Sequence, residues 1–136
     1  MSTLEDRIAQ WEQMCREAPD DMAYFSLGNS YKEAERWADA EAAYASAIEF
    51  NPTMSRAYHM RGQALLKLER NDEAGEVLTK GYAVAAERGD VMPQKSMAAL
   101  IEKLGLEIPE TEDFEAKKKA VEASGDQILD KRTGQP

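Results

Sequence analysis

The side chains that could act as nucleophiles or metal ligands are few in this 136-residue chain. It has one cysteine, Cys15, and one histidine, His59. We expect these residues in two helices that are separated by a complete structural unit, so a Cys–His nucleophile pair has little support. A zinc site needs about four ligands at usable spacing, which one cysteine and one histidine do not supply.

Phosphate and calcium sites also lack their sequence patterns. The eight glycines are scattered along the chain and form no glycine-rich phosphate loop. The acidic stretch at 110–115 lacks the regularly spaced oxygen ligands of a calcium loop. Cys15 continues an apolar stripe, which is typical of a small buried residue. The sequence therefore predicts a protein that is not an enzyme and that has no catalytic residue, no cofactor and no metal.

The charge balance limits the partners. The formal net charge is −9, whereas a nucleic-acid binder needs a cationic surface. The basic run Lys117–Lys119 follows acidic residues and is interpreted as a solvated helix face. No apolar stretch reaches the ~18 residues that cross a bilayer, and no secretory signal is visible. We therefore expect a cytoplasmic protein that binds neither nucleic acid nor membrane, with its single cysteine reduced.

The chain contains an internal repeat. When residues 21–54 are aligned with residues 55–88, an offset of 34, six positions are identical. These pairs are Ala23/Ala57, Tyr24/Tyr58, Gly28/Gly62, Glu35/Glu69, Arg36/Arg70 and Ala40/Ala74. A period of about 34 residues is typical of stacked helical hairpins.

Each unit has the pattern of two helices. Asp20 or Asp21 can cap the first helix, and Pro52 ends the second. The turn between them lies near residues 35–37. Apolar and small residues recur at helical spacing on both helices: Tyr24, Leu27, Gly28 and Tyr31, then Ala40, Tyr44, Ala47 and Ile48. Gly28 and Ala40 are expected to let the helices approach closely, and the tyrosines are expected to fill the core.

Residues 21–54 resemble a complete tetratricopeptide repeat (TPR). The family pattern is met by Tyr24, Leu27, Gly28, Tyr31, Ala40, Tyr44, Ala47 and Pro52. Residues 55–88 resemble a degenerate second copy, in which Arg61 and Ala86 replace the usual leucine and proline. Gly89 is then expected to cap the last helix of that copy. The resemblance implies an all-α fold of antiparallel hairpins stacked as a short TPR-type superhelical solenoid.

Single helices are expected to flank the two repeats. Residues 3–18 resemble the second helix of a preceding repeat, and residues 93–104 form a capping helix that Gly105 ends. The repeat domain is thus predicted at 1–105, with six helices, and a charged, partly flexible tail at 106–136. A helix at 111–123 and a flexible segment at 127–136 are expected within the tail.

The resemblance also implies a binding surface. In tetratricopeptide proteins the first helices of successive hairpins line a concave groove that holds a peptide or a partner helix. The corresponding positions are Met22, Phe25, Asn29, Lys32 and Glu33 in the first repeat, and Arg56, His59, Gln63, Leu66 and Lys67 in the second. Met97 is expected to continue this wall. We therefore predict a protein-binding adaptor or co-chaperone-like scaffold whose partner has apolar anchors and acidic or C-terminal carboxylate groups.

Two other functions remain open. One is self-association, in which the capping helix or tail docks on a second copy and forms a homodimer. The other is a targeting arm for a fused or separate enzyme, because residues 130–136 are similar to a linker between repeat domains and small bacterial iron-trafficking modules. That similarity covers seven residues and implies no metal ligand.

Overall fold

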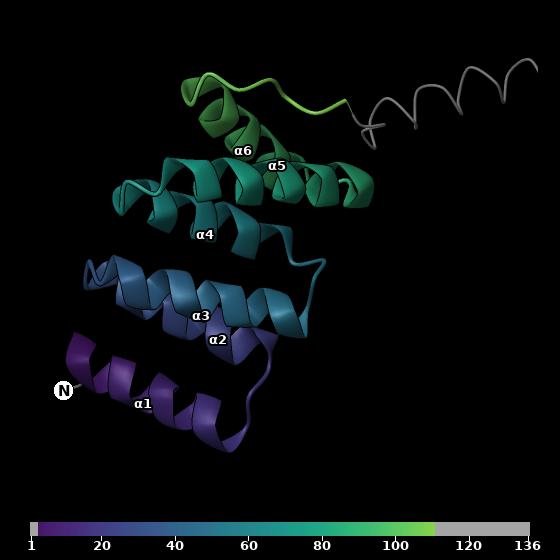
Figure 1. Cartoon of the computed structure of the whole chain (residues 1–136). Helices are drawn as coiled ribbons and strands as arrows, with labels where there is room; N and C mark the ends of the chain where they lie inside the picture. The colour runs from purple at the N-terminus through teal and green to yellow at the C-terminus, as the bar shows by residue number, and fades with distance from the viewer. Residues whose placement is uncertain (1–2, 111–136) are drawn as a thin grey trace, which may run out of the picture.

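The computed structural model describes residues 3–110, which form six helices. Their bounds are α1 (Leu4–Glu17), α2 (Asp21–Glu33), α3 (Trp37–Phe50), α4 (Ser55–Lys67), α5 (Asn71–Arg88) and α6 (Val91–Lys103). Helices that are consecutive in the chain pack against each other, so the helices stack in chain order from α1 to α6 (Figure 1). The predicted all-α solenoid with six helices is confirmed. The expectations for the tail at 111–123, 127–136 and 130–136 lie outside the described residues.

Glycines allow the two helices of each hairpin to come together. A Cβ atom at Gly28 of α2 would lie 2.6 Å from Cε1 of Tyr44 on α3, which no side chain could tolerate without movement. Gly62 of α4 meets Leu78 of α5 in the same way. Ala40 and Ala74, the small residues on the second helices, are fully buried. The predicted close contact between the hairpin helices is therefore confirmed in both repeats.

The turns within the two hairpins are the same. Glu35 and Glu69, which are 34 residues apart, adopt left-handed backbone conformations with φ of 58° and 59°. In each turn the next residue donates its N–H to a carbonyl near the end of the first helix, Arg36 to Tyr31 and Arg70 to Leu65, both at 2.9 Å. This pairing satisfies helix-end carbonyls that would otherwise lack a partner. The identical Glu-Arg dipeptides thus mark identical turns.

The helix ends largely agree with those predicted from the sequence. Asp20 caps α2 through a 2.7 Å bond from the Ala23 N–H, and Gly89, with a left-handed φ of 75°, ends α5. One boundary was wrong, because α6 begins at Val91, two residues before the expected start. Pro93 lies in the first turn of α6, where backbone N–H groups have no acceptor within the helix. The missing N–H of proline therefore costs no helical hydrogen bond there.

The core runs along the stack without interruption. Two clusters of buried side chains, one centred on α2 and α3 and the other on α4 to α6, both contact Ile48. Tyr44, Leu65, Leu78 and Met97 are among the largest side chains that are fully buried. This continuous core fixes the relative positions of the first helices α2 and α4 and of α6. None of the helices within 3–110 has the length and apolar content needed to cross a membrane.

Candidate binding surface

Side chains of α2 and α4 meet on one face of the stack. The Nζ atom of Lys32 on α2 lies 3.5 Å from the Sδ atom of Met60 on α4. Farther toward the start of the helices, the guanidinium carbon of Arg56 lies 4.9 Å from the centroid of the Phe25 ring. We call the surface formed by these helices and α6 the α2–α4–α6 face. Its members are Lys32, Arg56, His59, Met60, Gln63, Met92, Pro93 and Ser96.

Phe25 lies beneath this face and not on it. Its side chain is 4% exposed, and its ring packs against Tyr44 with the ring centroids 5.7 Å apart. Arg56 covers the outer side of the ring, an arrangement in which the cation is attracted to the π face. A ligand on this face therefore meets the guanidinium group before it meets the aromatic ring.

The single histidine is set between polar and charged neighbours. Burial, and then the positive charge of Lys32, lower the pKa of the His59 imidazole. The His59 Nε2 atom lies 3.2 Å from Nε2 of Gln63, so the neutral ring can accept the amide hydrogen. Both effects favour the neutral imidazole, whereas a carboxylate placed beside it would favour the protonated form.

Helices α4 and α6 enclose a cavity of about 240 Å³ on the same face. It is lined by Arg56, His59, Met60, Met92, Pro93 and Ser96. Met92 is 73% exposed, an unusual value for an apolar side chain. The sequence did not predict Met60, Met92, Pro93 or Ser96 as residues of the binding surface. Met60 could have been found, because it lies four residues after Arg56 and three before Gln63, on the same side of α4.

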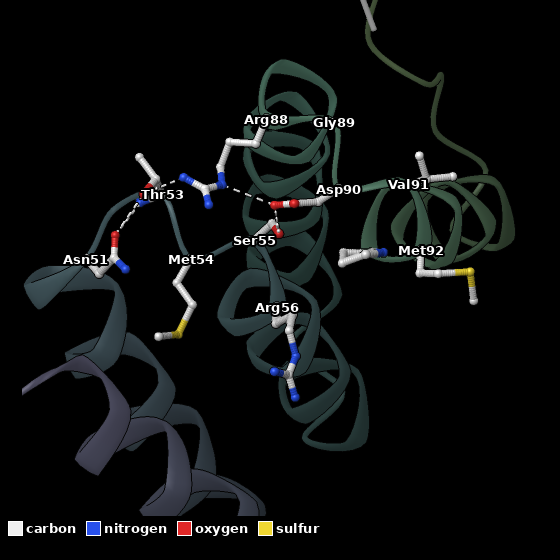
Figure 2. A pocket seen from close by; sticks show the side chains of 11 residues that line it. Asn51, Thr53, Met54, Ser55, Arg56, Arg88, Gly89, Asp90, Val91 and Met92 are labelled. Atoms are coloured by element: carbon white, nitrogen blue, oxygen red, sulfur yellow. Dashed lines mark hydrogen bonds and ion pairs between the residues drawn. The ribbon is translucent and has the colours of Figure 1, made fainter. Parts of the chain in front are cut away.

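A second cavity, of about 510 Å³, opens where the 51–54 loop approaches the junction of α5 and α6 (Figure 2). It shares Arg56, Met92 and Pro93 with the first cavity. The two cavities are therefore adjacent on the protein. The two together offer apolar surface from methionine and proline beside the guanidinium groups of Arg56 and Arg88.

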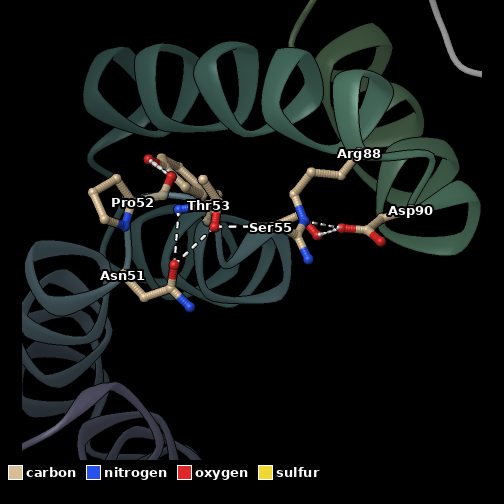
Figure 3. A network of polar contacts seen from close by, with 7 residues as sticks. Asn51, Pro52, Thr53, Ser55, Arg88 and Asp90 are labelled. Atoms are coloured by element: carbon tan, nitrogen blue, oxygen red, sulfur yellow. Dashed lines mark hydrogen bonds and ion pairs between the residues drawn. The ribbon is translucent and has the colours of Figure 1, made fainter.

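A polar network holds the wall of the second cavity (Figures 2 and 3). The Ser55 hydroxyl donates to Asp90 Oδ2 at 2.7 Å, and Arg88 Nε donates to the same oxygen at 3.1 Å. Arg88 Nη1 also donates to Thr53 Oγ1 at 3.3 Å. The network joins the start of α4 to the start of α6, and so it sets the spacing of the two helices that enclose the first cavity.

The other five residues that the sequence predicted for the groove do not lie together on this face. Asn29 Oδ1 accepts a 2.6 Å bond from the Tyr44 hydroxyl, and Leu66 is half-buried in the second core cluster. Glu33 pairs with Arg7 of α1 at 3.2 Å, and Lys67 Nζ lies 5.6 Å from the centroid of the Trp37 ring on α3. Met22 lines a different cavity, between α1 and α2. These five residues thus border the face or point to neighbouring helices.

The expectation for Met97 was wrong. This side chain is fully buried, and its sulfur lies over Gly81 of α5. Met97 therefore belongs to the core, and the side of α6 that joins the face carries Met92, Pro93 and Ser96 instead. The spacing within α6 predicted an apolar stripe correctly but did not show which neighbour the stripe would contact.

Cys15 and His59 belong to α1 and α4, which are not adjacent in the stack (Figure 1). Burial raises the pKa of the Cys15 thiol, and the charge of Asp20 adds to this shift, so the reactive thiolate is disfavoured. Within residues 3–110, no three His, Cys, Asp or Glu side chains group in a way that could hold a metal ion. The α2–α4–α6 face is therefore the best candidate for a functional site.

Comparison with known proteins supports the fold. Residues 55–87 match the model of the tetratricopeptide repeat family, and no curated protein matches the chain. Among solved structures, the chain is similar to the TPR2B domain of yeast Sti1 in its pHsp70 complex, with 21% sequence identity and a TM-score of 0.69. This similarity covers 75% of our chain and 82% of the Sti1 chain. The segment that matches the family model is the repeat with the weaker signature residues.

Proposed function

We propose that this tetratricopeptide-repeat chain is a protein-binding adaptor, and that it holds a peptide segment or helix on the α2–α4–α6 face. The TPR2B domain of Sti1, which has the same fold, is in a pHsp70 complex. A peptide or helix needs an apolar surface with a few placed polar groups. The cavity between α4 and α6, with Met60 and Met92 beside Arg56 and His59, supplies both.

The charge of this face favours an acidic ligand. The chain has a formal net charge of −9, yet Lys32 and Arg56 place two positive charges beside the cavity. Opposite charges at a surface increase the rate of association and help to select the partner. We therefore infer a ligand that combines an apolar side chain for the Met60–Met92 cavity with carboxylate groups for Arg56 and Lys32.

The cavity between α4 and α6 is the observation on which this proposal depends, and Arg56 is the residue that tests it. Short random peptides would be selected on the wild-type chain, on the Arg56→Glu variant and on a control. Arg16→Glu is a matched control, because it makes the same charge change on an exposed residue of α1, outside the face. We expect the wild type and Arg16→Glu to enrich peptides with Asp or Glu beside an apolar residue.

The Arg56→Glu variant should lose this enrichment. Its Kd for a peptide selected on the wild type should rise about tenfold or more, which corresponds to ~1.4 kcal/mol. Binding to the wild type should also weaken as salt is added, because exposed charges are screened. If Arg56→Glu selected the same peptides with the same Kd, the ligand would not lie on this face.

A further inference from the structure

The described stack begins and ends with half of a hairpin. In the two repeats, α2 and α4 are first helices, and α3 and α5 are second helices. Helix α1 precedes α2 in the way that α3 precedes α4, so it has the place of a second helix. Helix α6 follows α5 in the way that α4 follows α3, so it has the place of a first helix (Figure 1). Within residues 3–110, each end of the stack therefore presents one helix of a hairpin without the other.

The N-terminal end has an open cavity of about 340 Å³ between α1 and α2. Its lining is mostly apolar: Trp11, Met14, Ala18, Asp20, Met22, Ala23 and Ser26. The side chains of Met14 and Met22 are 45% and 54% exposed. Large apolar side chains that are half in water on adjacent helices are typical of an interaction surface.

The repeat shows what fits this cavity. Met22 and Ser26 of α2 correspond, 34 residues later, to Arg56 and Met60 of α4. Arg56 and Met60 both contact α2, through Phe25 and Lys32 respectively. The cavity residues of α2 thus occupy positions that, one repeat later, pack against a first helix.

Helix α1 gives the same result. Helices α1 and α3 end at Glu17 and Phe50, 33 residues apart, so Trp11 corresponds to Tyr44. Tyr44 is fully buried where α3 packs on Gly28 of α2, whereas Trp11 faces the open cavity. The cavity between α1 and α2 therefore corresponds to the place that a first helix occupies one repeat later.

The C-terminal end has a complementary opening. A cavity of about 790 Å³ lies between α5 and the chain that follows α6, lined by Asn71, Asp72, Gly75, Glu76, Thr79, Lys80, Leu104 and Leu106. Leu106 is 47% exposed and lies over Gly75. In the second repeat, the second helix α5 packs against the first helix α4. A second helix that packed against α6 in the same way would lie at this end of the stack.

The charges of the terminal helices distinguish between the ways in which two copies could meet. Helix α1 has two arginines against Glu5, Asp6, Glu12 and Glu17, a net charge of 2 − 4 = −2. Helix α6 has Lys95 and Lys103 against Glu102, a net charge of 2 − 1 = +1. Contact between α6 of one copy and α1 of another is therefore attractive, and contact between two copies of α1 is repulsive.

We propose that copies of this chain associate head to tail, so that α6 of one copy enters the α1–α2 cavity of the next. Helix α1 of that next copy then lies in the opening beside α5 and α6, and the pair α6 and α1 completes a third hairpin across the interface. Such a heterologous contact leaves one free end at each side, so assembly continues until a ring closes or the concentration limits it.

Two variants test this arrangement. Met14→Glu places a charge in the N-terminal cavity, and Leu106→Glu places one at the C-terminal opening. Phe50→Glu is a control, because Phe50 is 52% exposed but lines neither end cavity. Each full chain is first shown to be folded by circular dichroism, and its mass is then measured by sedimentation over a range of concentrations.

For the wild type and Phe50→Glu, we expect the mass to rise with concentration above the 15.2 kDa of one chain. Each end variant alone should raise the Kd of association about tenfold or more, because the introduced charge would be buried without a partner. A mixture of the two variants should form dimers and no larger species, since each has one intact end and these ends are of opposite kinds.

This mixing result is specific to unlike ends. If both variants associated as the wild type does, or if their mixture stayed monomeric while the wild type assembled, the head-to-tail arrangement would be wrong. A wild type that stayed at 15.2 kDa at every concentration would also overturn it, and the two cavities would then belong to residues 111–136 or to a different protein.

Discussion

Glu41 of α3 and Arg61 of α4 form an ion pair across the boundary between the two hairpins, with Oε1 and Nε 2.8 Å apart. The Glu41 side chain is 11% exposed and that of Arg61 is 27% exposed. Arg70 lies 4.0 Å from the other oxygen of the same carboxylate. The boundary between the hairpins is thus joined by a largely buried carboxylate with two cationic neighbours.

Removing the Glu41 carboxylate should destabilise the stack. In Glu41→Ala, Arg61 keeps its partly buried guanidinium but loses its partner, and leaving a charged group unpaired in this way costs about 2 kcal/mol. The measurement is the free energy of unfolding in urea. Asp39→Ala is the control, because the Arg36–Asp39 pair is about half exposed and such pairs contribute ~0.5 kcal/mol. Equal losses from both substitutions would show that burial of the Glu41 pair is unimportant.

The close approach at Gly28 gives a second prediction. In Gly28→Ala, the added methyl group would meet the Tyr44 ring at 2.6 Å, and Tyr44 has no room to move because it is fully buried. Forcing an extra carbon into a packed core typically costs about 1–3 kcal/mol. We expect a loss of this size in the free energy of unfolding, measured in urea.

Gly75→Ala is the matched control, and we expect it to cause no loss in the free energy of unfolding. The atom nearest to its new methyl group is Cδ1 of Leu106 at 2.8 Å, and Leu106 is half-exposed and can turn away. Replacing glycine by alanine within a helix gains up to about 1 kcal/mol, so Gly75→Ala should be neutral or stabilising. A loss at Gly75 as large as the loss at Gly28 would mean that backbone geometry, and not the Tyr44 contact, determines the effect.

The fold could be predicted from the sequence because the repeat gives the same information twice. Gly28 and Gly62 recur with the large side chains that pack on them, and the turns at Glu35 and Glu69 recur with their neighbours. Each residue in these pairs interacts within its own hairpin. Spacing along one or two helices therefore describes its surroundings fully.

The binding surface was harder to predict, because it depends on contacts between hairpins. The resemblance to tetratricopeptide repeats placed Phe25 in the groove, but Arg56 of α4 covers it. Spacing also put Met97 on an apolar stripe without showing that the stripe faces α5. Met92 was missed because it precedes the proline that was expected to begin its helix. The degree of burial of such residues is set by the neighbouring helix, which periodicity within one helix does not describe.

The cap at Asp20 gives a third prediction. Its carboxylate accepts the N–H of Ala23 at 2.7 Å, and this bond satisfies a helix-end donor. Asp20→Ala should lower the free energy of unfolding by about 1 kcal/mol, whereas Asp20→Asn should change it little, because asparagine caps nearly as well. Urea unfolding of both variants checks the prediction. A large loss in Asp20→Asn would indicate that the charge, and not the hydrogen bond, stabilises this end of α2.

His59 should make the stability of the protein depend on pH. Because burial and Lys32 lower the pKa of its imidazole in the folded protein, the unfolded chain takes up this proton first as the pH falls. The contribution of His59 to the free energy of unfolding is therefore fully present above the pKa of the unfolded chain, about 6.5. It is lost as the pH falls from there toward the lower pKa of the folded protein. The free energy of unfolding of the wild type, compared with that of His59→Gln, should therefore decrease between pH 7 and pH values below about 6.5.

The same residue should give ligand binding the opposite dependence on pH. A carboxylate of the ligand on the α2–α4–α6 face would favour protonated His59. The affinity for an acidic peptide should therefore increase as the pH falls from 7 toward 6, and this increase should be absent in His59→Gln. Titration calorimetry at several pH values measures both proteins. Equal pH dependence in the two would show that the ligand carboxylate does not lie beside His59, and would move the ligand toward Arg88 and the second cavity.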